Sequence, residues 1–223
     1  MSQPGHKFVV ILGAGLQGSC VALELARRGM KVVLLDQDEI PMNRASLRNE
    51  GKVHLGLVYA NDRTSATASL ILQGALHFNY LLARWLGSAI NQLNYSTPFN
   101  YLVANDSLLT ADDLAKHYSA VESEYHRQLA QHPHLDYLGK RPERIYRLLS
   151  LEELASHVRL SCFQAGFQTP ELAIDPEQLA ILIRQAIHLS PRIQFLPSHR
   201  VKRVERVISH NGDWSLWGCC YSL

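Results

Sequence analysis

The feature that most constrains the fold of this chain is the stretch from Phe8 to Asp36, in which an apolar run leads into a glycine-rich turn. The turn, Gly13-Ala-Gly-Leu-Gln-Gly18, has the spacing G-x-G-x-x-G. A segment of helical character follows, and a second apolar run over residues 32–35 ends at Asp36. This order predicts a strand–turn–helix–strand unit of the kind that holds a dinucleotide.

Each glycine of the turn has a separate expected role. Gly13 allows a tight turn out of the strand, Gly15 lets the backbone approach a pyrophosphate, and Gly18 lets the helix pack close to the strand. The helix is predicted over residues 16–28, with Gly29 as its C-terminal stop. Phosphates would lie at its N-terminus, where free N–H groups and the helix dipole favour an anion.

The acid at the end of the second apolar run bears on which dinucleotide would bind. Asp36 can accept hydrogen bonds from both hydroxyls of a ribose, and its charge disfavours the 2′-phosphate of NADP. A tight strand–helix turn that binds nothing is the alternative interpretation of the glycines.

Composition excludes several classes of protein. The chain has 223 residues, 47% of them hydrophobic, which is typical of a globular protein with one or two domains. Its 22 basic and 20 acidic side chains give no electrostatic reason to expect nucleic acid or an anionic membrane as a partner. We expect no transmembrane segment, because no apolar run approaches roughly 18 residues. Residues 1–7 are too few for a signal peptide before the first strand.

The cysteines and histidines suggest neither disulfides nor a metal site. Cys20, Cys162, Cys219 and Cys220 lack metal-ligand spacing, and an adjacent pair is not a structural disulfide pattern. A reducing compartment fits best, so we expect a cytoplasmic protein. The 11 histidines are scattered, and we expect no metal.

Beyond Asp36 the sequence predicts mixed helices and strands. Residues 47–59 are polar at first and then alternate, which predicts an extended segment through Tyr59. Helices are expected at residues 63–86, 111–131 (capped by Thr110), 150–157 (opened by a Ser150–Glu153 capping box) and 176–189. Strands are expected at residues 97–104, 145–149, 193–196, 201–208 and 213–217. The last strands look antiparallel, with a turn at Asn211-Gly212.

Residues 45–59 carry a resemblance to a known family. The stretch Asn49-Glu-Gly-Lys-Val-His-Leu-Gly56, after a serine-containing loop, resembles the FAD-dependent oxidoreductases of the D-amino acid oxidase superfamily. This superfamily includes glycine and sarcosine oxidases, glycerol-3-phosphate dehydrogenase and L-2-hydroxyglutarate oxidase. The segments at 169–179 and 199–204 resemble the family's return to its FAD domain.

The resemblance implies an α/β fold in which a Rossmann-like FAD-binding domain, a parallel sheet with helices, is interrupted by an α+β substrate domain. The FAD-binding domain would comprise residues 1–88 and 169–223, with a partial substrate or cap domain at 89–168. The family continues well past the hairpin at which this sequence stops, so the C-terminal part is expected to be missing and the chain to be a truncated form or fragment.

The resemblance also implies roles for individual residues. The FAD pyrophosphate would lie on the turn formed by Gly13, Ala14, Gly15, Leu16, Gln17 and Gly18. Asp36 would hold the adenosine ribose, with Gln37 beside it, and Val201 would pair its backbone with adenine. Contacts with the phosphates and ribityl chain would come from Arg44, Ala45 and Ser46. Asn49, Glu50 and Gly51 would lie beside the flavin.

The implied activity is oxidation of a small hydroxy acid or amino acid by hydride transfer to the flavin, with oxygen or another electron acceptor. His54 is the one acid–base candidate, although a loop or core histidine bonded to backbone is an equal interpretation. A non-catalytic dinucleotide-binding remnant is the alternative function. An NAD-dependent dehydrogenase is disfavoured, because further βα units do not follow Asp36 directly.

Overall fold

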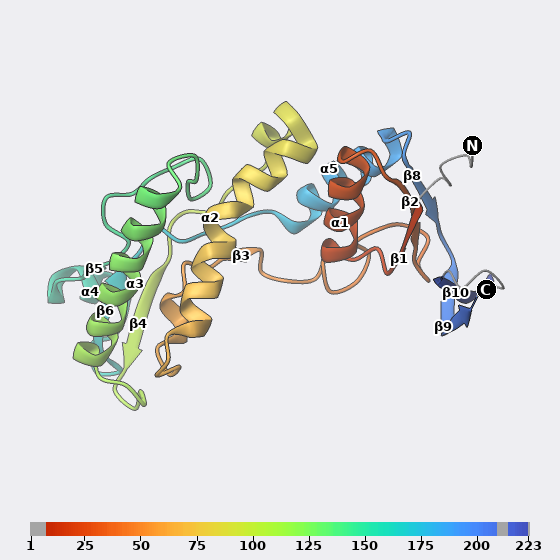
Figure 1. Cartoon of the computed structure of the whole chain (residues 1–223). Coiled ribbons are helices and arrows are strands. Elements are labelled where there is room, and N and C mark those ends of the chain that lie inside the picture. The colour runs from red at the N-terminus through yellow and green to blue at the C-terminus, as the bar shows by residue number, and fades with distance from the viewer. Residues whose placement is uncertain (1–7, 209–213, 223) are drawn as a thin grey trace. The chain divides into compact units, whose positions relative to one another are not determined.

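The computed structural model describes residues 8–208 and 214–222, and these form two compact units (Figure 1). Unit 1 comprises residues 1–49, 85–91 and 176–223, and unit 2 comprises residues 50–84 and 92–175. Each unit is built from segments that are distant in the sequence. This division differs from the expected domain bounds, because residues 50–84 belong to the same unit as the central segment.

Unit 1 contains a parallel sheet with the strand order β1-β2-β8. Its elements are β1 (Phe8–Leu12), α1 (Leu16–Arg27), β2 (Lys31–Leu35), α5 (Pro176–Leu189) and β8 (Ile193–Leu196). In the register, Val9 lies opposite Val32, and Val33 lies opposite Gln194. The strand–turn–helix–strand prediction is therefore confirmed. The prediction that the strand at 193–196 is antiparallel is wrong. This strand, β8, runs parallel to β2, because α5 returns the chain to the starting end of the sheet.

Two further strands of unit 1 form an antiparallel pair. β9 spans His199–Ile208 and β10 spans Trp214–Ser222, with a shift in register between Cys219 and Cys220. Both strands were expected, and both are longer than expected. The turn expected at Asn211-Gly212 lies outside the described residues.

Unit 2 contains an antiparallel sheet with the order β4-β6-β5 and a separate short pair of strands. β4 (Asn100–Ala104) and β5 (Arg147–Leu148) both pair with β6 (Phe163–Gln168). β3 (Lys52–Val53) pairs with β7 (Leu172–Ala173). β6 was not predicted, although the alternation of Phe163, Ala165 and Phe167 with glutamine and glycine is a strand pattern.

The helices α3 (Ala111–Gln131) and α4 (Leu151–His157) begin where their capping residues predict, whereas α2 (Ala66–Leu86) begins three residues after its expected start. α3 has a capping box between Thr110 and Asp113, and α4 has one between Ser150 and Glu153. α2 leads into the 3-10 helix η2, Gly87–Gln92. These boxes satisfy backbone N–H groups that the first helical turn leaves without partners.

The extended segment expected through Tyr59 is shorter than predicted. β3 ends at Val53, and residues Leu57–Tyr59 form the 3-10 helix η1. The cause is Gly56, which has a φ of 101°. A β-carbon at Gly56 would lie 2.7 Å from the carbonyl oxygen of Ala68, so the chain turns against α2 at this point. Tyr59 is therefore not a strand residue.

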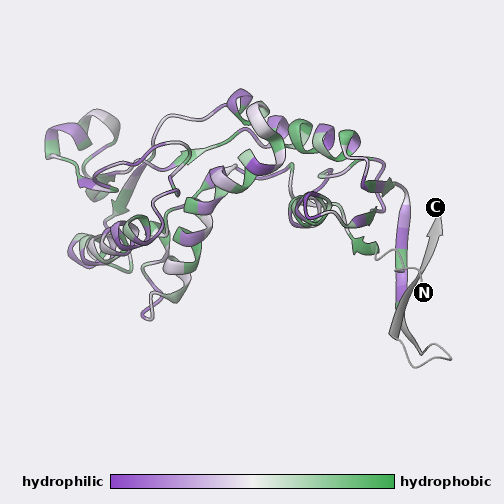
Figure 2. Cartoon of the chain, turned by 45° about the horizontal axis from the view of Figure 1, so that its top comes forward, coloured by the Kyte–Doolittle hydropathy of each residue, from purple (hydrophilic) through white to green (hydrophobic). Residues whose placement is uncertain are grey.

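Each unit has its own apolar core. In unit 1 the buried side chains include Ala22, Leu34 and Ile183. In unit 2 an aromatic core forms where Tyr118 meets Phe167 edge-on, with ring centroids 4.9 Å apart. Hydrophilic and hydrophobic residues alternate in bands along the helices (Figure 2), as expected for helices that bury one face.

Within the described residues, no helix has both the length and the apolar character that a membrane span requires.

Candidate functional site

The glycine turn has the backbone geometry that its sequence predicts. Gly13 has a φ of 97°, which only glycine adopts readily, and Gly15 is extended at the N-terminus of α1. A β-carbon on Gly18 would lie 1.9 Å from the carbonyl oxygen of Gly13. Leu16 and Gln17 are the first helical residues. The turn thus brings backbone N–H groups together at the start of a helix, an arrangement that favours anions.

Ser46 lies directly at this helix N-terminus. Its Oγ accepts a hydrogen bond from the Leu16 amide at 2.9 Å. A β-carbon on Gly15 would lie 3.3 Å from the same oxygen. Ala14 is buried, and its carbonyl oxygen accepts a hydrogen bond from the Met42 amide at 2.7 Å. The loop after β2 is therefore fastened against the glycine turn.

Asp36 follows β2 and connects the same two segments. Its Oδ2 accepts a hydrogen bond from the Ala14 amide at 2.5 Å, and its Oδ1 accepts one from the Asp38 amide at 2.9 Å. The start of β9 is joined here too, because the His199 amide donates to the Asp36 carbonyl oxygen at 2.7 Å. Asp36 thus holds the glycine turn, its own loop and β9 together.

A hollow of about 230 Å³ in unit 1 brings together four of the predicted cofactor residues. It is lined by Leu12, Gly13, Leu35, Asp36, Gln37, His199, Arg200 and Val201. The residues expected to hold ribose and adenine therefore border the same space as the first glycine of the turn, although they are far apart in the sequence.

Arg44 and Asn49 have partners within the loop itself. The Arg44 guanidinium pairs with Asp38, with Nη2 2.7 Å from Oδ1 and Nε 2.8 Å from Oδ2. This guanidinium holds the pKa of the Asp38 carboxyl below its usual value. Asn49 donates from Nδ2 to the carbonyl oxygens of Ala45 and Ser46, at 3.1 and 3.0 Å. Arg44 and Ala45 also border a second hollow, with Asp38, Asn43 and Arg48.

Arg184 was not among the residues predicted from the sequence. It lies on α5, and its Nε donates to the carbonyl oxygen of Pro41 at 2.8 Å. Arg184 therefore anchors the loop between Asp36 and Ser46, although it lies more than a hundred residues later in the sequence. An arginine in an amphipathic helix gives no local signal of such a role.

The groups around the glycine turn of unit 1 have the chemistry that the phosphates and ribose of a dinucleotide require. Gly15 leaves space at the helix N-terminus that a side chain would reduce, and the Ser46 hydroxyl, whose oxygen already accepts from the Leu16 amide, and the Asp36 carboxylate lie beside the turn. Amide N–H groups suit a pyrophosphate, and a carboxylate suits ribose hydroxyls.

Glu50, Gly51 and His54 belong to unit 2. Glu50 is exposed and pairs with Lys52, whose Nζ is 2.8 Å from Oε2, and this ammonium lowers the pKa of the Glu50 carboxyl. Gly51 has a φ of 66°, and its carbonyl oxygen accepts a hydrogen bond from the Ile174 amide at 2.9 Å.

His54 lies in a polar cluster with two residues that the sequence did not single out. Its Nδ1 is 3.1 Å from Oε2 of Glu171 and 3.2 Å from the hydroxyl oxygen of Tyr101. The Tyr101 hydroxyl also donates to the same Oε2, and burial together with the negative charge of Glu171 raises the pKa of this phenol. Neither of the earlier interpretations of His54 included a buried carboxylate partner.

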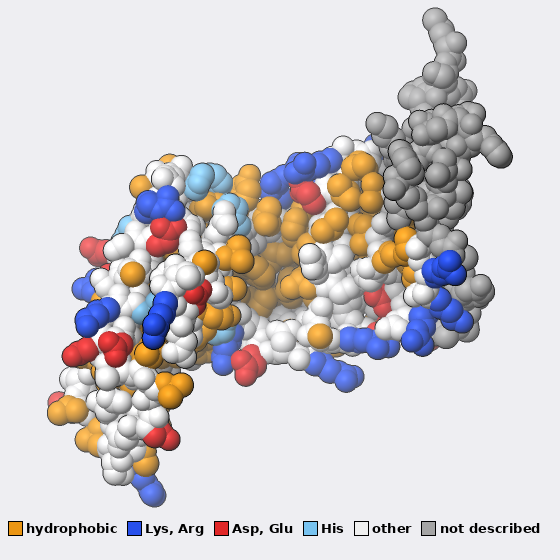
Figure 3. All heavy atoms as spheres, turned by 60° about the horizontal axis from the view of Figure 1, so that its bottom comes forward, with side chains coloured by type: hydrophobic (Ala, Val, Ile, Leu, Met, Phe, Trp, Pro, Cys, Tyr) orange, Lys and Arg blue, Asp and Glu red, His pale blue; other side chains and the backbone are white. Residues whose placement is uncertain are grey.

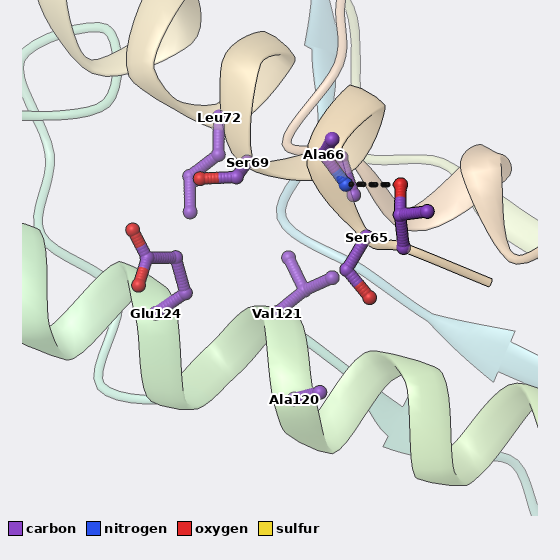
Figure 4. A pocket seen from close by; sticks show the side chains of 9 residues that line it. Ser65, Ala66, Ser69, Leu72, Ala120, Val121 and Glu124 are labelled. Atoms are coloured by element: carbon purple, nitrogen blue, oxygen red, sulfur yellow. Dashed lines mark hydrogen bonds between the residues drawn. The ribbon is translucent and has the colours of Figure 1, made fainter. Parts of the chain in front are cut away.

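A separate pocket of about 320 Å³ lies between α2 and α3 of unit 2. In Figure 4, Ser69 and Leu72 of α2 face Val121 and Glu124 of α3. The pocket contains none of the predicted site residues. Glu124 is already paired with Arg127, at 2.6 Å, so its charge is compensated within α3.

Comparison with known proteins identifies the family. The family model described as "FAD dependent oxidoreductase" matches residues 9–218. Curated relatives are the tRNA 5-methylaminomethyl-2-thiouridine biosynthesis bifunctional proteins MnmC. The protein from Pseudomonas savastanoi pv. phaseolicola is 33% identical over 97 residues, which cover 41% of this chain and 14% of the relative. The one from Burkholderia lata is 28% identical over 200 residues, covering 88% and 27%.

Solved structures show the same fold. Glycine oxidase from Geobacillus kaustophilus aligns with a TM-score of 0.63 and 16% identity, over 94% of this chain and 52% of that one. Iminodiacetate oxidase from Chelativorans sp. BNC1 aligns with a TM-score of 0.56 and 21% identity, over 95% and 51%. The chain therefore spans about half the length of these structures and a smaller share of its curated relatives.

The curated relatives also bear on possible partners. Their name refers to tRNA, so the expected absence of a nucleic-acid partner finds no support in the comparisons. Basic and acidic side chains both lie on the face shown in Figure 3.

Because the family model covers nearly the whole chain and the fold agrees with it, the chain belongs to the FAD dependent oxidoreductase family.

Proposed function

We propose that this chain binds FAD through unit 1 and takes part in the oxidation of a small amino acid or hydroxy acid. The observation that carries the proposal is the hollow in which Gly13, Asp36 and Val201 meet beside the N-terminus of α1. A dinucleotide-binding site needs a glycine turn for the phosphates and an acid for the ribose close to each other. Gly13 would serve the first purpose and Asp36 the second, and both line this hollow.

The substrate class is argued from relatives and from chemistry. Bound FAD accepts two electrons and a proton, as a hydride, from a carbon that bears an amine or a hydroxyl. Glycine oxidase and iminodiacetate oxidase are named for amines that carry a carboxylate, and a further structural neighbour is an L-α-glycerophosphate oxidase. The name of the curated relatives mentions tRNA, so a tRNA that carries an amine-bearing carbon is also a candidate substrate.

The protein's own contribution would be binding, orientation and proton transfer. The Asp36 carboxylate would orient the ribose, and the Ser46 hydroxyl, oriented by the Leu16 amide, would donate its hydrogen to a phosphate oxygen. Arg44, Ala45, Asn49, Glu50 and Gly51 remain the proposed contacts with the rest of the cofactor. His54 would accept the proton that leaves the substrate's nitrogen or oxygen, since a neutral imidazole is suited to this at physiological pH.

The test is cofactor binding by the 223-residue chain. We expect FAD titration to give flavin absorbance that remains with the protein after gel filtration, and NAD and NADP to bind at least about tenfold more weakly. Gly15→Ala is the informative variant, because φ −65° and ψ −179° suit alanine while the added methyl narrows the phosphate site. Gly74→Ala is the matched control, because its methyl would meet nothing within 4 Å.

The outcomes separate the alternatives. Preferential binding of NAD would overturn the proposal in favour of a dehydrogenase. FAD binding without turnover on a panel of glycine, sarcosine, glycolate and 2-hydroxyglutarate would indicate a non-catalytic dinucleotide-binding chain. A Gly15→Ala variant that folds and binds FAD as tightly as Gly74→Ala would show that the cofactor site lies elsewhere.

A further inference from the structure

Unit 2 contains a carboxylate that is fully shielded from solvent. Glu171 precedes β7 and has no exposed surface. Its Oε1 accepts a hydrogen bond from the Leu55 amide at 2.6 Å, and its Oε2 is shared by Tyr101 and His54. A carboxylate loses much solvation free energy on burial, so it persists only where its oxygens are well satisfied.

Counting hydrogens assigns the proton on His54. A carboxylate only accepts hydrogen bonds, and Tyr101 has one hydroxyl hydrogen, which it donates to Oε2 of Glu171. The raised pKa of the Tyr101 phenol keeps that hydrogen in place. With Glu171 as a carboxylate, the hydrogen between Oε2 and Nδ1 of His54, 3.1 Å apart, belongs to Nδ1. A neutral His54 then has its lone pair on Nε2.

The surroundings of His54 suit a group that exchanges protons. Its side chain is 25% exposed, whereas that of Glu171 is 0% exposed. Among the described residues no hydrogen bond to Nε2 is present. Of the nearby charged groups, Glu50 interacts with His54 electrostatically, but Glu50 is exposed and paired with Lys52. Glu171 is therefore the charge that acts on the ring at hydrogen-bonding distance.

We propose that Glu171 is a positioning residue that fixes His54 in the Nδ1–H tautomer, with Tyr101 as the second anchor of the carboxylate. The role of Nε2 rests on the proposed function, in which a substrate amine or hydroxyl loses a proton. That proton would move from the substrate's nitrogen or oxygen to Nε2. The Nδ1 hydrogen stays where it is, and the positive charge formed on the ring faces Glu171.

A purely structural role for Glu171 is the competing explanation, because Oε1 also holds the Leu55 amide. Tyr137 provides a matched control in the same unit. Its hydroxyl donates to the Val53 carbonyl oxygen at 2.6 Å and accepts from the Leu172 amide at 2.8 Å, so it joins β3 to β7, and among the described residues it has no hydrogen bond with His54 or Glu171. A variant at Tyr137 should affect stability and leave the tautomer unchanged.

The test is nitrogen-15 NMR of the histidine rings in the full chain, without FAD or substrate, in alkaline buffer. His54→Asn identifies the His54 signals. We expect the Nδ1–H tautomer in the unmodified chain and in Tyr101→Phe and Tyr137→Phe. In Glu171→Gln, which keeps an oxygen for Leu55, the ratio of Nδ1–H to Nε2–H should fall on the order of tenfold or more, as for loss of a charged hydrogen bond.

Either of two results would overturn the inference: an Nε2–H tautomer in the unmodified chain, or an unchanged ratio in Glu171→Gln. A shift in Tyr137→Phe as large as that in Glu171→Gln would overturn it as well, because the change would then reflect a general loosening of unit 2. Because these spectra need no cofactor, failure to bind FAD would end the proposed function and leave the tautomer result standing.

Discussion

The carbonyl oxygen of Gly13 lies so close to Gly18 that a β-carbon on Gly18 would be 1.9 Å from it. Backbone atoms of the turn would have to move to admit any side chain. The third glycine of the motif is therefore required by the contact between α1 and the end of β1, whereas Gly15 borders the proposed ligand.

Gly18→Ala should destabilise unit 1. Overpacking against backbone costs typically 1–3 kcal/mol, and we expect a value near or above the upper end, about 3 kcal/mol, because no flexible side chain can give way. Urea unfolding followed by circular dichroism measures this. A folded variant with unchanged stability would contradict the close approach.

Gly74→Ala should change the free energy of unfolding in the opposite direction and stabilise the protein. Gly74 is an exposed residue inside α2, and an added methyl there would meet nothing within 4 Å. Alanine is favoured over glycine in a helix interior by about 1 kcal/mol, so the free energy of unfolding should rise by about that amount. The same urea titration provides the comparison with Gly18→Ala.

Asp36→Asn should weaken both the fold of the turn and FAD binding. Each carboxylate oxygen of Asp36 accepts a backbone N–H, and asparagine has only one oxygen. Leaving one amide without its acceptor costs about 1–3 kcal/mol. We expect a lower melting temperature and a Kd for FAD raised about tenfold or more, by fluorescence titration. Glu39→Gln, which removes the same charge from a nearby exposed residue, should change neither.

Tyr137→Phe should destabilise unit 2 by about 1–3 kcal/mol, the cost of a buried backbone group left without a partner. The lost hydroxyl serves the Leu172 amide and the Val53 carbonyl oxygen. Tyr80→Phe is the control, because no hydrogen bond from the Tyr80 hydroxyl occurs within the described residues. Equal melting temperatures for the two variants would refute the bridging role.

The stability contributed by Glu153 should depend on pH. The Arg147 guanidinium, with the Ser150 amide, lowers the pKa of Glu153 to about 2 from its usual 4.5. Since the folded-state pKa is the lower one, the contribution is fully present above pH 4.5 and is lost as the pH falls to about 2. The difference in melting temperature between the unmodified chain and Glu153→Gln should shrink over this interval, and also with added salt, because the pair is exposed.

Local features of the fold were predictable from the sequence. The caps at Thr110 and Ser150 were, because a cap needs only the residue itself and one three positions later. The glycine turn and the strand before Asp36 were predictable for the same reason. Helix and strand bounds in these regions agree with the structure within a few residues.

Features that depend on distant partners were not predictable. β3 and β7 are two residues long and exist only because they pair with each other. The direction of β8 depends on where α5 delivers the chain. Glu171 could not be distinguished from any other acid until its contacts with His54 and Leu55, more than a hundred positions earlier, were known.

The parallel pairing of β2 with β8 also means that the sheet of unit 1 needs a strand that is synthesised after unit 2. β1, α1 and β2 are synthesised first, and the edge of β2 that β8 covers stays open until all of unit 2 has been made. Open edges of apolar strands are prone to mispairing, and closing a long loop costs entropy that a folded intervening unit reduces. Substitutions that delay the folding of unit 2 should therefore delay completion of the parallel sheet β1-β2-β8, even where they change none of its residues.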